Sequence, residues 1–121
     1  MQHSCSYNSY YNSALQSWVN HSNHIIMMNN EYYNVSKMED LPLLFTRTMQ
    51  KDFIHYYNSG ISGHTYMHIP MVNWGVRNLT QYVYANLAWD VFADVEKITE
   101  EYFNFRYGEF ASQMKEIYEI I

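Results

Sequence analysis

The chain has 121 residues, enough for one domain with a modest core of its own. Its net charge is −5, and its seven Lys and Arg residues are scattered from Lys37 to Lys115, so the clustered positive charge of a nucleic-acid-binding surface is missing. No apolar run has the length of a membrane span, and the single cysteine, Cys5, excludes an internal disulfide.

The first predicted elements are a short helix and a strand. Residues 1–12 are polar and show no period. Apolar residues at helical spacing then predict a helix from Ser13 to about Asn20, with Trp18 in the core. The run His24–Met28 is compact, apolar and flanked by Asn, which is typical of a strand buried on both faces of a parallel sheet.

A long helix and a second strand follow. The helix starts after the predicted cap Asp40, ends at Asn58–Gly60, and has one apolar face made of Leu41, Leu44, Phe45, Met49, Phe53 and Tyr56. The second strand is predicted over Ile61–Ile69, between Gly60 and Pro70. Because a helix joins the two strands, the order predicts a βαβ unit with parallel strands.

The last third of the chain is predicted to be helical. Leu79, Val83 and Leu87 mark one helix, with Trp89 also assigned to the core. Asp94 is expected to cap the next helix and Gly108 to close it, with Val95, Ile98, Tyr102 and Phe105 on its apolar face. The last helix has Phe110, Met114, Ile117 and Ile121 on one face.

Several short stretches carry a resemblance to a known family. They are Cys5-Ser6-Tyr7-Asn8, Glu31-Tyr32-Tyr33-Asn34, Asp52-Phe53, Tyr56-Tyr57, Gly60-Ile61, Tyr66-Met67-His68, Trp74-Gly75, Leu87-Ala88-Trp89-Asp90 and Tyr107-Gly108. In their order and spacing the chain resembles an uncharacterised bacterial domain-of-unknown-function family, whose members are similar to α-glucuronidases and related glycoside hydrolases.

The resemblance implies a fold of the α/β class. It makes residues 1–121 a single partial domain, the C-terminal fragment of a (β/α)8 TIM-type barrel. Residues 1–90 would supply the last two βα units, and residues 91–121 would form two trailing helices. A chain that lacks the other strands is expected to be poorly stable or self-associating in isolation.

The resemblance also implies a site at the C-terminal ends of the strands. Glu31 is the candidate catalytic residue, which would act as general base or nucleophile on a glycosidic bond. The alternative is that its side chain only hydrogen-bonds loop backbone or contacts water. The predicted substrate-binding residues are Asn30, Tyr32, Tyr66, His68, Asn73 and Trp74. Because glycoside hydrolysis needs two carboxyl groups, the second is expected upstream, and this piece alone would be inactive.

Neither a metal nor a cofactor is predicted. His64 and His68 are four residues apart, but no third ligand accompanies them at a fixed spacing. His64 is therefore assigned to the core. No phosphate-binding loop, dinucleotide fingerprint or nucleophile elbow is found in the sequence.

Three functions are compatible with the sequence. The first is part of a glycoside hydrolase-like, carbohydrate-active enzyme. The second is a sugar-binding or scaffolding barrel module without turnover, and the third is a small self-associating α/β domain. The expected partner is an oligo- or polysaccharide bound by the full-length protein, with no nucleic acid and no membrane. No signal peptide is visible in the sequence, which favours the cytoplasm.

Overall fold

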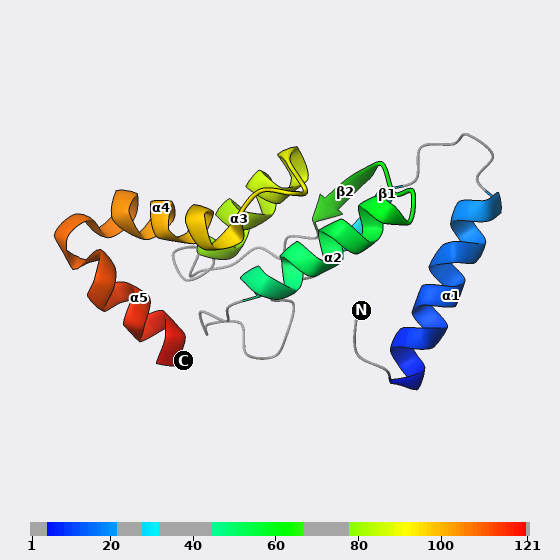
Figure 1. Cartoon of the computed structure of the whole chain (residues 1–121), viewed down its shortest axis with the longest axis horizontal. Helices are drawn as coiled ribbons and strands as arrows, with labels where there is room; N and C mark the ends of the chain where they lie inside the picture. Colours follow the sequence, from blue (N-terminus) through cyan, green and yellow to red (C-terminus); the bar gives the residue numbers. More distant parts are fainter. Residues whose placement is uncertain (1–4, 22–27, 32–44, 67–77, 121) are drawn as a thin grey trace.

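The computed structural model describes residues 5–21, 28–31, 45–66 and 78–120. In chain order the elements are α1 (Ser6–His21), β1 (Met28–Glu31), α2 (Thr46–Asn58), β2 (Gly63–Tyr66), α3 (Asn78–Trp89), α4 (Val95–Tyr107), the 3-10 turn η2 (Gly108–Phe110) and α5 (Ala111–Ile120). Figure 1 shows α2, α3 and the strand pair in the middle of the molecule, with α1 at one end of its long axis and α4 and α5 at the other.

The two strands pair in parallel, which is the relation that the strand–helix–strand order predicts. Met28 pairs with Gly63, and Glu31 pairs with Tyr66. Both strands are only four residues long. The second lies inside the predicted segment Ile61–Ile69, whereas β1 begins at Met28, where the predicted strand ends; residues 24–27 lie outside the described residues.

The prediction of a (β/α)8 barrel fragment is wrong. The described residues form five α-helices and only one pair of short strands, so the chain is mainly helical and not of the α/β class. A barrel strand is covered on both faces, but the side chain of Met28 in β1 is 56% exposed. The physical reason is that the core lies between helices, which bury each other's apolar faces without a sheet.

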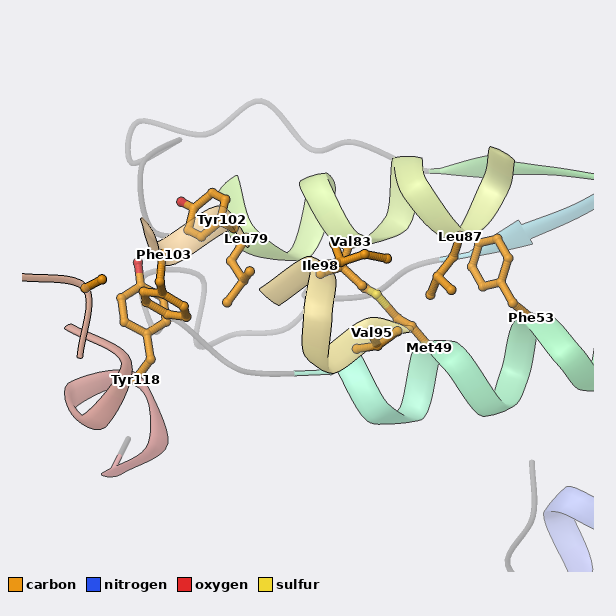
Figure 2. Packing of buried hydrophobic residues seen from close by; sticks show 11 residues of the cluster. Met49, Phe53, Leu79, Val83, Leu87, Val95, Ile98, Tyr102, Phe103 and Tyr118 are labelled. Atoms are coloured by element: carbon orange, nitrogen blue, oxygen red, sulfur yellow. The ribbon is translucent and has the colours of Figure 1, made fainter. Parts of the chain in front are cut away.

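This core joins α2, α3, α4 and α5 (Figure 2). Its fully or nearly fully buried members are Met49, Phe53, Leu79, Val83, Leu87, Val95, Ile98, Tyr102, Phe103, Ala111 and Tyr118. The predicted α3 face, Leu79, Val83 and Leu87, is confirmed. Burial of each large apolar side chain contributes about 1.5–3 kcal/mol, so this cluster is the main source of stability.

The ends of two helices follow their predicted signals. One side-chain oxygen of Asp94 accepts hydrogen bonds from the backbone N–H groups of Glu96 and Lys97 at 3.0 and 3.3 Å, which caps α4. Gly108 ends α4 with a positive φ of 53°. Helix α2 ends at Asn58 as expected, but it begins at Thr46, and the predicted cap Asp40 lies outside the described residues.

Several core assignments are wrong. Trp18 and Trp89 are exposed, at 68% and 94%. In α4 Phe103 is buried and Phe105 is 92% exposed. In α5 the buried residues are Ala111 and Tyr118, whereas Ile117 is exposed. Packing against the neighbouring helices, and not the spacing within one helix, decides which of these side chains are buried.

Candidate interaction surface

The structure places two of the predicted site residues next to each other. Glu31 ends β1 and Tyr66 ends β2, and they are register partners at the same end of the strand pair. Asn30 precedes Glu31 in β1 and pairs with Thr65. Four other predicted residues, Tyr32, His68, Asn73 and Trp74, lie outside the described residues. A catalytic role for Glu31 therefore stays a prediction.

An aromatic cluster surrounds His64 where β2 meets α2 and α3. The His64 ring stacks on Phe53, with centroids 4.2 Å apart and an interplanar angle of 27°. Tyr56 approaches the same imidazole at 5.6 Å. Tyr84 of α3 joins the cluster through Phe53 at 5.2 Å and through Tyr66 at 4.9 Å. These ring contacts attach the strand pair to the helical core.

The imidazole of His64 is adapted to the uncharged state. Burial lowers its pKa, because the protonated ring loses hydration among aromatic neighbours. Its Nδ1 atom is buried and finds no hydrogen-bond partner among the described residues. In the described part of the chain no three His, Cys, Asp or Glu residues are placed to hold a metal ion. These ring contacts indicate a packing role for His64, although its side chain is only partly buried and is not a member of the core cluster to which the sequence assigns it.

A groove between α2, α4 and α5 has a volume of about 400 Å³. Its charged lining residues are Arg47, Glu96, Lys115 and Glu119. The Arg47 Nε atom donates a hydrogen bond to the Glu96 carboxylate at 2.8 Å. Because the two positive and two negative charges cancel, the groove offers no electrostatic preference for a charged ligand.

Helix α1 presents the most unusual surface of the described chain. It is 16 residues long and none of its residues is buried. Tyr7 is 75% exposed, and Tyr11 and Trp18 are also largely exposed. Together with Ala14 they follow the spacing of four, three and four residues that places side chains on one side of a helix. Tyr7, Tyr11, Ala14 and Trp18 are called the aromatic stripe below.

The neighbouring side of α1 rests on the turn that follows α2. The Gln16 side-chain amide donates a hydrogen bond to the Ser59 hydroxyl at 3.0 Å. Val19 lies close to Gly60, where an added Cβ atom would stand 3.1 Å from the Val19 Cγ1 atom. Asn12 and Leu15 lie on this partly buried side as well. The aromatic stripe lies about 100° around the helix from this side, and its three aromatic members are exposed.

The charge distribution sets α1 apart from the rest of the chain. All seven basic and all twelve acidic residues lie between Glu31 and Glu119, so residues 1–30 contain no Asp, Glu, Lys or Arg. Interface cores are depleted in charged residues and enriched in Tyr and Trp. The aromatic stripe has both properties, which makes it the candidate functional surface.

This surface was not predicted from the sequence. Residues 1–12 show no obvious period and Trp18 is predicted to lie in the core, whereas α1 begins at Ser6 and Trp18 is exposed. The spacing of Tyr7, Tyr11, Ala14 and Trp18, combined with the absence of charge, is the signal that identifies it. Cys5 precedes α1 and caps its first turn, because its sulfur accepts a hydrogen bond from the Asn8 N–H at 3.4 Å.

Comparisons with protein-family models, curated proteins and solved structures find no match for this chain. The resemblance to the α-glucuronidase-like family therefore stays a prediction. Among the helices that the structure describes, none combines the length and the apolar character needed to cross a membrane.

Proposed function

We propose that this chain is a polypeptide-binding domain and that the aromatic stripe of α1 is its contact surface. The observation that carries the proposal is the exposure of Tyr7, Tyr11 and Trp18 on one side of a helix that buries none of its own residues. Aromatic residues of this kind dominate binding energy at protein interfaces.

The stability of α1 supports the proposal. Isolated helices shorter than about 12–15 residues are marginal in water even for Ala-rich sequences, and most helical stability in proteins comes from packing. Helix α1 is rich in Ser, Asn and Tyr, which are poorer helix formers than Ala or Leu. It also lacks Glu–Lys pairs that would support it from within, because it contains neither residue. A partner that covers the aromatic stripe would bury side chains that are exposed in the described part of the chain.

Hydrogen exchange tests whether α1 is available to a partner. In dilute solution we expect the α1 amides to exchange with protection factors below about 10, as in fraying segments, and those of α4 to be protected at least about 1,000-fold. Equal protection of α1 and α4 in dilute monomeric protein would show that α1 is held by its own chain, and the proposal would fail.

Carbohydrate binding is the second candidate function. The backbone register that pairs Glu31 with Tyr66 at one end of the strand pair favours it, because acidic and aromatic residues are common in sugar-binding sites. The proposal here is binding, without the barrel that the resemblance implies. Titration of isotope-labelled protein with a uronic-acid oligosaccharide would shift the Tyr66 resonances, and Tyr66→Ala would abolish the shifts elsewhere. Unchanged resonances at millimolar sugar would count against this candidate.

A further inference from the structure

We infer that the partner of α1 is a second copy of this chain, docked antiparallel along the aromatic stripe. The inference rests on the proposed function and deepens it, because it names the occupant of the contact surface. Three properties of α1 support it: the order of large and small side chains, the charge distribution and the hydrogen-bonding character of the helix.

The aromatic stripe is complementary to itself in the antiparallel direction. The midpoint along the sequence between Tyr7 and Trp18 lies between residues 12 and 13. The midpoint between Tyr11 and Ala14 is the same. A two-fold axis at that point places Tyr11 of one copy on Ala14 of the other, and Tyr7 beside Trp18. At the centre of the pair a large residue, Tyr11, then meets a small one, Ala14, as close helix packing requires. Toward the ends the two large aromatic residues, Tyr7 and Trp18, meet each other. A parallel pair would instead place Tyr11 on Tyr11 and leave a gap at Ala14.

Charge also favours a contact through α1. Two copies of a chain with a net charge of −5 repel each other, and repulsion is weakest where no charged residue lies at the contact. Helix α1 is such a place, since Ser6–His21 contains no Asp, Glu, Lys or Arg. Its Tyr, Ser, Asn and Gln side chains both donate and accept hydrogen bonds, so each can pair with an identical residue of the other copy.

The size of the contact sets the expected affinity. A helix of 16 residues is about 24 Å long. Two such helices bury less area than a standard protein interface, which places the pair in the weak, transient class. We therefore expect a monomer–dimer equilibrium with a dissociation constant on the order of 10 µM.

Sedimentation equilibrium on the full chain tests the inference with a charge-swap pair. Wild-type protein is expected to shift from monomer to dimer between about 1 µM and about 1 mM. Tyr11→Lys alone and Ala14→Glu alone should each raise the dissociation constant at least about tenfold, because each buries an unpaired charge against an apolar neighbour. An equimolar mixture of the two variants should dimerise again, since the antiparallel geometry places the new Lys on the new Glu.

The control is Ser13→Lys, which adds the same charge to an exposed position at the centre of α1, off the aromatic stripe. It should leave the dissociation constant within about twofold of wild type, the usual range for such exposed substitutions. Dimerisation that survives both stripe variants, or a mixture that stays monomeric, would overturn the antiparallel pair.

A monomer at all concentrations would also overturn the inference, and hydrogen exchange then separates its two causes. If α1 exchanges rapidly in that monomer, the proposed function stands and the occupant is a different polypeptide. If α1 is protected in that monomer, its own chain covers it, and the proposed function fails together with the second copy.

Discussion

At the scale of single residues, His64 shows how packing sets a protonation state. Its ring lies against Phe53 and Tyr56, and burial lowers its pKa. The neutral ring fits this aromatic environment, whereas the charged ring would lose hydration without gaining a partner among the described residues. Folding therefore opposes protonation of His64.

This opposition gives stability a defined pH dependence. In the unfolded chain the pKa of His64 is about 6.5, and in the folded chain it is lower. The unfolded state then binds more protons below that value, so the contribution of His64 is complete above pH 6.5 and is lost as the pH falls through the folded pKa. We predict that the free energy of unfolding decreases from pH 7.5 to pH 5, as measured by urea denaturation.

His64→Phe should flatten this pH dependence, because Phe keeps the stacking on Phe53 and does not titrate in this range. His21→Gln is the control, since the His21 side chain is exposed on α1. If wild type and His64→Phe lose stability in parallel as the pH falls, the burial of His64 is not the cause.

At the scale of elements, the sequence predicts helix ends better than helix faces. The Asp94 cap and the Gly108 end of α4 depend on local chemistry, a side-chain acceptor and a residue tolerant of positive φ, which any reader of the sequence can recognise. The face of α4 depends on what the neighbouring helices offer. Phe103 and Phe105 are both apolar, so the sequence of α4 alone does not show which one is buried. Packing against α5 and α3 buries Phe103.

The barrel prediction failed for a related reason. The run His24–Met28 and the segment Ile61–Ile69 read as strands of a large parallel sheet, but strand length and the number of neighbours are not local properties. Of the site, the sequence places Glu31 and Tyr66 side by side through the parallel order of their strands. The aromatic stripe was missed because polar Ser and Asn residues between Tyr7, Tyr11 and Trp18 mask their period.

The Asp94 cap yields a prediction for α4. Asp94→Ala removes the acceptor for two backbone N–H groups, those of Glu96 and Lys97, and should lower the free energy of unfolding by about 0.5–2 kcal/mol. Asp94→Asn keeps an acceptor and should recover most of this loss. Urea denaturation of the three proteins measures it, and equal stability of the Ala and Asn variants would show that the cap is not the source.

At the scale of the whole molecule, the core cluster and the aromatic stripe are two separate groups of apolar residues. The cluster that includes Phe53, Val83 and Phe103 holds α2 to α5 together (Figure 2). The aromatic stripe lies at the far end of the molecule from α5 and takes no part in that cluster (Figure 1). Stability and binding should therefore respond to different substitutions.

This division can be measured in monomeric protein at low concentration. Tyr11→Lys should change the free energy of unfolding by no more than about 0.5 kcal/mol, as is usual for exposed positions. Phe53→Ala should lower it by about 3–5 kcal/mol, because it opens a cavity in the core. A loss of several kcal/mol for Tyr11→Lys in the monomer would show that the aromatic stripe is part of the fold.

The antiparallel pairing of α1 is tested most directly by a distance between two copies. Cys5 is exposed, precedes α1 and is the only cysteine of the chain, so one spin label can be attached there without mutation. At concentrations that favour the dimer, double electron–electron resonance should give an intermolecular label distance centred at about 25 Å, the offset of two antiparallel helix starts across a helix pair. Dipolar broadening of the continuous-wave spectrum, which reports distances near 10 Å, would indicate parallel helices. The absence of both broadening and an intermolecular distance would contradict the pairing of two copies through α1.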